Sequence, residues 1–307
     1  MFFHHLFGQE VVESSWVDKL ARTPLSQVLA FVGICTILRI FLYPFLAKVP
    51  AHKRTGMHTA GRFLNEALDA LIYAGVFVFL IIRPYFIQAF TIPSGSMLQT
   101  LQIRDFIIAN KAIYRYSEPQ FQDIIVFRPP LTAVNRSQID PDGQVNVDFI
   151  KRCLGVPGDL IEIRNGTLVR NGKAITEPYV EEKPIYDWKL VKYKGEYWPV
   201  NMSSSIVNQD MTAPKFIANS PEMMEELRAL PAEKIPPGYL LMVGDNRNGS
   251  YDGRAWGLVP REDVIGRSEV IWMPLNRMRF TRDVNTLPAW FISAGLIGFF
   301  GWRMFRK

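Results

Sequence analysis

The sequence predicts a mainly β domain anchored by N-terminal transmembrane helices. Three observations indicate this fold. Apolar runs are concentrated near the two ends of the 307-residue chain. The middle of the chain is polar and rich in strand-forming residues, and Asn-Gly pairs, which favour hairpin turns, occur within it. The net charge of +6 is typical either of nucleic-acid binding or of the cytoplasmic flanks of a membrane protein.

The N-terminal part contains two candidate membrane spans. Residues 1–24 form an extension without the apolar core of a signal peptide. Residues 25–46 are apolar over a length that fits a spanning helix of ~20 residues, and Arg39 is expected to extend toward one interface. A buried helix of a soluble protein is the alternative. Residues 67–83 form the second apolar run and end at Arg83-Pro84.

The loop between the two runs, residues 47–66, carries an excess of cations. The positive-inside rule therefore places it in the cytoplasm, and residues 84–285 on the outer, periplasmic side of the cytoplasmic (inner) membrane. Residues 286–307 combine an apolar run with a basic tail. They form a candidate third helix, which either spans the bilayer or lies flat at its surface.

Residues 84–285 are predicted to be an extracytoplasmic, β-rich domain. Residues 105–110 and 123–127 have the composition of strands, and residues 160–172 hold two Asn-Gly pairs that predict successive hairpins. Residues 183–236 show no clear periodicity and are interpreted as an insertion. Within them, Ser220-Pro221 and the glutamates that follow predict one short helix.

All four histidines precede Phe90, so the polar domain contains none. This excludes Ser-His chemistry and His-ligated zinc from that domain. A catalytic serine there would need a lysine or a carboxylate as its base. Such chemistry needs no cofactor and no metal.

Ser96 and Lys151 are the candidate catalytic pair. Ser96 follows Gly95 directly after the second span, where the backbone can approach a substrate closely. Lysine serves as a base only when its pKa falls to about 7–8, which burial among apolar side chains achieves. Strand alternation places Phe149, Lys151 and Cys153 on one largely apolar face. A turn at Ser96 and a surface lysine at position 151 are the alternatives.

Two further features could support acyl transfer. The Ser96 backbone N–H and the Ser94 hydroxyl are candidate donors to an oxyanion. Residues 244–254 are dense in turn-forming residues, and Asp252 and Arg254 could pair across one turn. An ordinary surface loop is the alternative for this stretch.

Three motifs in this order resemble the bacterial type I signal peptidase (leader peptidase) family, whose members are Ser-Lys dyad serine proteases. They are Pro-Ser-Gly-Ser-Met at 93–97, Phe-Ile-Lys-Arg at 149–152 and Gly-Asp-Asn-Arg at 244–247. The resemblance covers most of residues 84–275. It implies a mainly β catalytic domain of the signal peptidase-like β fold, and a membrane-bound serine endopeptidase that removes signal peptides from exported preproteins.

The resemblance also implies roles for individual residues. Ser96 would be the nucleophile, Lys151 the general base, Ser94 an oxyanion-hole donor and Ser250 the residue that orients the lysine. Asp252 and Arg254 would form a structural ion pair near the site. The family usually has proline where this chain has Gln99, and Asp-Asn where it has Asn248-Gly249, which puts the shape of these loops in question.

The substrate is expected to add as an extended strand beside segments 90–96 and 147–151. Shallow apolar pockets would then select Ala-X-Ala-like sequences by rejecting large side chains. The candidate substrate-binding residues are Phe90, Ile92, Pro93, Met97, Leu101, Phe149 and Ile150.

The expected partners are the signal peptides of secreted preproteins and the lipid bilayer, with the export machinery as a further candidate. Nucleic acid is not expected, because the cations cluster at the membrane flanks and no base-stacking module is present. Two other functions remain open from the sequence. One is a Ser-Lys endopeptidase with another substrate, such as an organellar inner-membrane peptidase. The other is a non-catalytic β domain that binds export partners.

Overall fold

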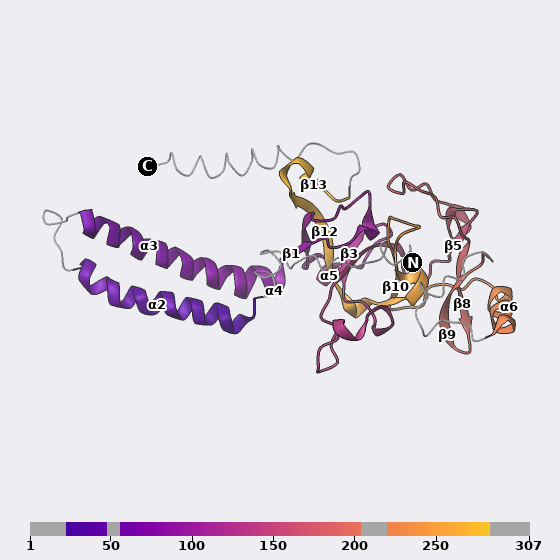
Figure 1. Cartoon of the computed structure of the whole chain (residues 1–307), viewed down its shortest axis with the longest axis horizontal. Coiled ribbons are helices and arrows are strands. Elements are labelled where there is room, and N and C mark those ends of the chain that lie inside the picture. The colour runs from indigo at the N-terminus through magenta and orange to yellow at the C-terminus, as the bar shows by residue number, and fades with distance from the viewer. Residues whose placement is uncertain (1–22, 48–55, 204–219, 283–307) are drawn as a thin grey trace, which may run out of the picture. The chain divides into compact units, whose positions relative to one another are not determined.

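The computed structural model describes residues 23–47, 56–203 and 220–282 of the chain (Figure 1). Two compact units divide between Phe90 and Thr91. The described residues exclude the predicted C-terminal helix, most of the N-terminal extension, residues 48–55 of the basic loop and residues 204–219 of the predicted insertion.

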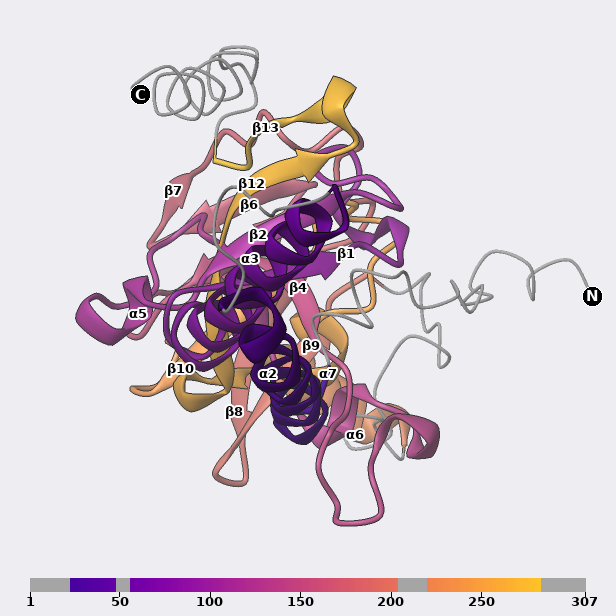
Figure 2. The ribbon, with the colours of Figure 1, turned by 90° about the vertical axis from the view of Figure 1, so that its left-hand side faces the viewer.

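The N-terminal unit is a pair of antiparallel helices that lie side by side, as both views show (Figures 1 and 2). Two segments in the described residues, Leu25–Pro44 and Gly56–Tyr85, are long and apolar enough to cross a membrane. The helix with the second apolar run starts at Gly56, within the stretch predicted as a loop, because helix formation continues beyond the apolar residues. The elements are α2 (Leu25–Ala47), α3 (Gly56–Val76), the π-helical η2 (Phe77–Ile82) and α4 (Arg83–Tyr85).

Arg39 has a partner that the sequence analysis does not name. Its guanidinium lies 2.6 Å from the carboxylate of Asp69, which joins α2 to α3. Two opposite charges in apolar helices attract strongly because little water separates them. The pairing satisfies both charges within the helix pair.

The larger sheet of the second unit has eight strands. Its order is β1-β2-β12-β3-β4-β10-β11, and β13 pairs with β12. Its central pairings, β3 with β4 and β4 with β10, are antiparallel. The bounds are β1 (Ile87–Thr91), β2 (Phe106–Asn110), β3 (Ile124–Phe127), β4 (Phe149–Gly155), β10 (Tyr239–Val243), β11 (Val259–Pro260), β12 (Val264–Met273) and β13 (Arg279–Phe280).

The smaller sheet has five strands in the order β7-β6-β5-β8-β9. Both predicted Asn-Gly hairpins are present, since β6 pairs with β5 and with β7. The turn residues all have positive φ, between 48° and 79°: Asn165, Gly166, Asn171 and Gly172. The bounds are β5 (Ile161–Arg164), β6 (Thr167–Arg170), β7 (Lys173–Ala174), β8 (Trp188–Tyr193) and β9 (Glu196–Asn201).

Part of the stretch 183–236 joins this sheet. Strand β8 pairs with β5, and β8 turns into β9 at Lys194-Gly195, where both residues have positive φ. The signal was a glycine-containing turn between two runs that are rich in Trp, Tyr and Val. The predicted short helix is confirmed as α6 (Pro221–Ala229), and the Ser220 hydroxyl caps it by accepting a bond from the Met223 N–H.

Alternation along β4 and β10 connects two apolar cores. Cys153 and Met242 pack into one buried cluster, whereas Leu154 and Leu241 pack into a second cluster that also contains the inner face of the smaller sheet. The central strands are therefore buried on both faces. This burial is the environment into which charged residues of β4 must fit.

Short helices connect the strands. They are η3 (Gly95–Met97), α5 (Ile113–Tyr116), η4 (Leu131–Ala133), η5 (Arg136–Gln138), α7 (Gly253–Trp256), η8 (Arg261–Asp263) and η9 (Leu275–Arg277).

Candidate active site

Lys151 lies on β4, in register with Ile125 of the neighbouring strand β3. The predicted alternation is confirmed: Phe149 and Cys153 both pack against the first cluster, and the lysine ammonium lies 5.5 Å from the centre of the Phe149 ring. Only 5% of Lys151 is exposed. The strand therefore holds an amine inside an apolar environment.

Ser96 lies in the single turn η3 that follows β1. The loop after β10 holds this turn by two hydrogen bonds. The Asn246 backbone N–H donates to the Ser96 carbonyl over 3.1 Å, and its side-chain amide donates to the Gly95 carbonyl over 3.1 Å. The position of the serine is therefore set by a residue that is 150 positions away in the sequence.

Lys151 Nζ lies 2.8 Å from Ser96 Oγ and 3.0 Å from the Ile150 carbonyl oxygen. Burial lowers the pKa of Lys151 to about 8, although the nearby carboxylate of Asp252 raises it. At pH 7, roughly a tenth of the amine is therefore neutral, and the neutral fraction increases as the pH approaches 8. An uncharged amine in hydrogen-bonding contact with a hydroxyl is the arrangement that general-base activation of a serine requires.

Ser94 and Ser250 are the two other serines predicted to support this pair. Ser94 Oγ is 3.4 Å from Ser96 Oγ. Ser250 is buried, and a Cβ added to Gly244 would lie 2.2 Å from Ser250 Oγ and 2.4 Å from the Ser96 carbonyl oxygen. Only glycine therefore fits at position 244, between the two serines.

In the described part of the chain, Ser250 and Lys151 are not joined by a hydrogen bond. The Ser250 hydroxyl has no hydrogen-bond partner of ordinary geometry among the described residues. Burial raises the pKa of Asp252 to about 6, and backbone N–H donors and the nearby Ser250 hydroxyl oppose that rise. The Ser250 hydroxyl therefore affects the pKa of Asp252, whereas it is not among the groups that shift the pKa of Lys151.

Asp252 and Arg254 form the ion pair that the sequence analysis expects. Arg254 Nε lies 2.7 Å from one carboxylate oxygen, and Nη2 lies 2.6 Å from the other. Asp252 also accepts the backbone N–H of Gly244 over 2.8 Å. The pair therefore fixes the start of the loop that holds Ser96.

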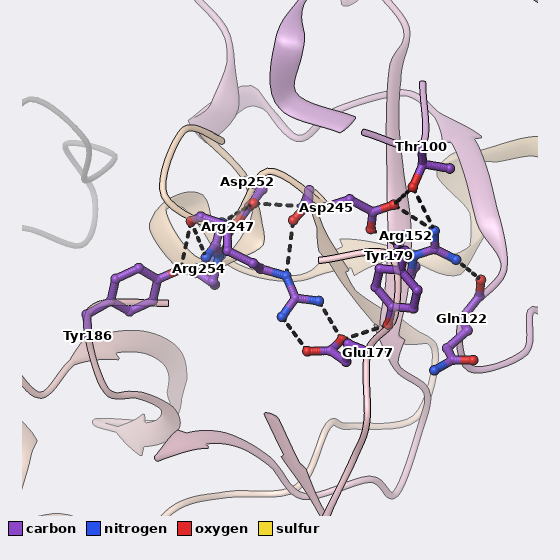
Figure 3. A network of polar contacts seen from close by, with 11 residues as sticks. Thr100, Gln122, Arg152, Glu177, Tyr179, Tyr186, Asp245, Arg247, Asp252 and Arg254 are labelled. Carbon is purple, nitrogen blue, oxygen red and sulfur yellow. Dashed lines mark hydrogen bonds and ion pairs between the residues drawn. The ribbon is translucent and has the colours of Figure 1, made fainter. Parts of the chain in front are cut away.

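A second set of buried charges lies on the opposite face of β4 (Figure 3). Arg152 donates two hydrogen bonds to Asp245, of 2.8 and 2.6 Å, and Thr100 donates to the same carboxylate over 2.5 Å. The ring of Tyr179 lies 3.7 Å from the Arg152 guanidinium. Buried charges are tolerated only when paired and hydrogen-bonded in this way.

Comparison with known proteins identifies the family to which this chain belongs. A model described as "Signal peptidase, peptidase S26" matches residues 64–273. This chain belongs to that family. Membership confirms the resemblance stated above and makes the chain a serine-type endopeptidase, which sets aside the non-catalytic binding domain.

Three relatives indicate the extent of the likeness. A signal peptidase I of Leptolyngbya laminosa is 32% identical, over 75% of this chain and 89% of the relative. A probable signal peptidase I-1 of Synechocystis is 30% identical, over 74% and 92%. A signal peptidase I of Aquifex aeolicus is 34% identical, over 63% and 78%.

The residues predicted to bind substrate in this chain differ in exposure. Pro93 is exposed, and Phe90, Phe149 and Ile150 are half-buried. The others are almost fully buried, so in this structure they can support a pocket from behind but present no surface to a ligand. These are Ile92 (2% exposed), Met97 (0%) and Leu101 (0%).

Sequence reasoning did not single out the side chains that tie the peptidase site together. Arg152 and Asp245 lie within quoted motifs, but no role was assigned to them. Glu177, which receives two hydrogen bonds from Arg247, carried no signal at all. The pair of Arg152 and Asp245 could have been found from the sequence, because each is a charged residue within or next to an otherwise apolar strand pattern. The contact with Glu177 depends on tertiary structure.

No group of three or more His, Cys, Asp or Glu side chains arranged to hold a metal ion is present in the described parts of the chain. The site geometry relies on a hydroxyl and an amine, with charged residues as supports.

Proposed function

We propose that this enzyme removes N-terminal signal peptides from exported preproteins, with Ser96 as nucleophile and Lys151 as general base. The observation that carries the proposal is the 2.8 Å contact between Lys151 Nζ and Ser96 Oγ. Burial of the amine, which lowers its pKa to about 8, makes the contact chemically useful. Family membership and the names of the relatives support the choice of substrate.

In the acylation step, the neutral amine of Lys151 accepts the Ser96 proton while Oγ attacks the carbonyl carbon of the scissile bond. The Ser94 hydroxyl and the Ser96 backbone N–H are proposed as donors to the resulting oxyanion. When the carbon–nitrogen bond breaks, Lys151 delivers the proton to the leaving amine. The signal peptide is then held as an ester on Ser96.

In the deacylation step, Lys151 removes a proton from a water molecule that attacks the ester. The ester bond breaks, Ser96 Oγ recovers a proton from the lysine, and the signal peptide leaves with a carboxyl terminus. Proposed positions for its small residues lie beside Pro93, Phe149 and Ile150. Ser250 and the Asp252–Arg254 pair are proposed to maintain the surroundings of the lysine rather than to react.

The proposed setting is the cytoplasmic membrane. Two helices can cross the bilayer by length and composition, and the cations Lys48, Lys53, Arg54 and Arg62 follow the first of them. The positive-inside rule then puts these cations in the cytoplasm and the catalytic unit outside. Preproteins would present their cleavage sites from the bilayer, and the export machinery is the proposed source of these substrates.

The test is cleavage of a peptide that carries Ala-X-Ala after an apolar run, by the full chain in detergent. Ser96→Ala and Lys151→Ala should each abolish cleavage while the thermal unfolding curve stays cooperative. Lys173→Ala, at an exposed lysine of β7, is the matched control and should retain activity. Cleavage that persists in either dyad variant would show that another pair performs the chemistry.

A further inference from the structure

Residues 177–187, here called the strap, cross three segments of the proposed active site. The strap links β7 to β8 and contains little regular structure. Its side chains and carbonyls nevertheless contact the segment after Ser96, strand β4 and the loop after β10. Figure 3 shows three of its residues, Glu177, Tyr179 and Tyr186, that point into this network.

The strap is bound most firmly to the loop after β10. Glu177 forms a two-armed ion pair with Arg247, with distances of 2.7 and 2.5 Å, and the Tyr186 hydroxyl donates to the Arg247 carbonyl over 2.8 Å. Asn248 donates to the Lys183 carbonyl over 3.1 Å and accepts the Ile185 N–H over 3.3 Å. The ion pair has little exposure to water and is therefore weakly screened.

A second contact reaches the nucleophile segment. Gln99 lies three residues after Ser96, and its amide donates to the Glu181 carboxylate over 2.5 Å. Tyr179 adds a contact to β4, where its ring covers the guanidinium of Arg152. One strap therefore contacts the segment that carries the serine and the strand that carries the lysine.

Gln99 and Asn248 both place an amide side chain against the same strap. The loop that carries Asn248 also carries Asn246, which holds the Gly95 and Ser96 carbonyls. Two chains of contacts thus connect the strap to the serine turn. One passes directly through Gln99, and the other passes through the 246–248 loop.

We propose that the strap positions the serine turn, and that Glu181 is a positioning residue that acts through Gln99. The role rests on the proposed function of Ser96. The amide of Gln99 restrains the residues after the serine, so that Oγ remains at the lysine. Loss of this restraint lets the turn depart from the reactive geometry, to which acyl transfer is sensitive.

The test compares neighbouring carboxylates in the full chain. Glu181→Ala removes the acceptor for Gln99. Glu182→Ala is the matched control, because no ion pair or hydrogen bond of this side chain is present in the described structure. Hydrogen–deuterium exchange of peptides that cover residues 95–101 reports the mobility of the serine turn without requiring activity. Cleavage kinetics of the same samples separate kcat from KM.

Glu181→Ala should speed exchange over residues 95–101 and lower kcat about three- to tenfold, as expected for one solvent-exposed hydrogen bond of ordinary strength, with little change in KM. The pH midpoint of kcat should stay in place, because the lysine's surroundings are unaltered. Gln99→Ala should reproduce both effects, and the double variant should be no worse than either single one.

Equal exchange and equal kcat in the Glu181→Ala and Glu182→Ala variants would overturn the role of the strap and leave the proposed peptidase activity intact. A wild-type chain that cleaves no preprotein peptide would overturn the proposed function instead. The exchange measurement would still decide whether Glu181 restrains the turn.

Discussion

At the scale of single residues, the environment of Lys151 decides what Ser96 can do. The hydroxyl is a weak nucleophile until its proton is removed, and a charged ammonium cannot accept that proton. The apolar face of β4 disfavours the charged form, whereas Asp252 favours it. Desolvation is the larger effect, so the pKa of the amine falls to about 8.

The rate of cleavage should therefore increase with pH. Only the neutral amine is active, so kcat/KM should rise tenfold per pH unit below the pKa of Lys151 and level off above about 8. A pH series of initial rates on the full chain, with stability checked at each pH, measures this midpoint. A rate that is flat from pH 6 to pH 9, by contrast, would mean that no buried amine controls the reaction.

The same burial has a cost in stability. The folded pKa of Lys151 is about 8, below the ordinary lysine value of 10.5, so the unfolded chain binds more protons between these values. Stability from this group therefore increases as pH rises through that window. At pH 7 the buried amine costs at most about 3 kcal/mol.

Lys151→Met should be inactive yet at least as stable as the wild type at pH 7. Methionine has similar length and no charge, so the cost of burying the amine disappears, partly offset by lost hydrogen bonds. Thermal unfolding in one detergent at pH 7 and pH 10 measures the difference. The advantage of the variant should shrink at the higher pH, and an advantage that grows would contradict the assigned direction.

At the scale of elements, alternation along a strand separates two chemical tasks. Lys151 faces the first core with Phe149 and Cys153. Arg152 points the other way and meets Asp245 and Tyr179. One strand thus presents a reactive amine on one face and a structural cation on the other, because successive side chains point to opposite faces.

The helix pair of the N-terminal unit carries a comparable structural charge. Arg39→Ala should leave Asp69 without its partner between apolar helices and should destabilise the helix pair by about 2–3 kcal/mol in lipid. Asp69→Ala should do the same to Arg39. The exchange of both charges, Arg39→Asp with Asp69→Arg, should recover much of the loss. Thermal unfolding in lipid nanodiscs measures it, and a double variant no better than the singles would argue against the pairing.

At the scale of the whole molecule, buried charges join segments that are distant in the sequence. Thr100 and Asp245 are 145 positions apart, and Arg152 and Asp245 are 93 apart. The network therefore links the serine segment, the lysine strand and the loop after β10. Such contacts form only when the sheet is complete.

Asp245→Ala should cost about 3–5 kcal/mol, because it leaves the Arg152 guanidinium buried without a counter-charge. Denaturant unfolding followed by tryptophan fluorescence measures this loss. Combining Arg152→Met with Asp245→Leu should cost less than the single change, since no unpaired charge remains. A single variant with wild-type stability would mean that the pair does not hold these segments together.

The sequence by itself determined the local elements and pointed to Ser96 and Lys151 as the proposed reactive pair. These features depend on residues that are neighbours in the sequence. They are the apolar runs, the Asn-Gly turns, the capped helix at Ser220 and the strand alternation that buries Lys151. Tertiary structure alone decided the lowered pKa of that lysine, the partner of Arg39 and the strap contacts of Gln99. Each of these depends on groups brought together from distant segments, and burial and pairing of charge exist only once the chain has folded.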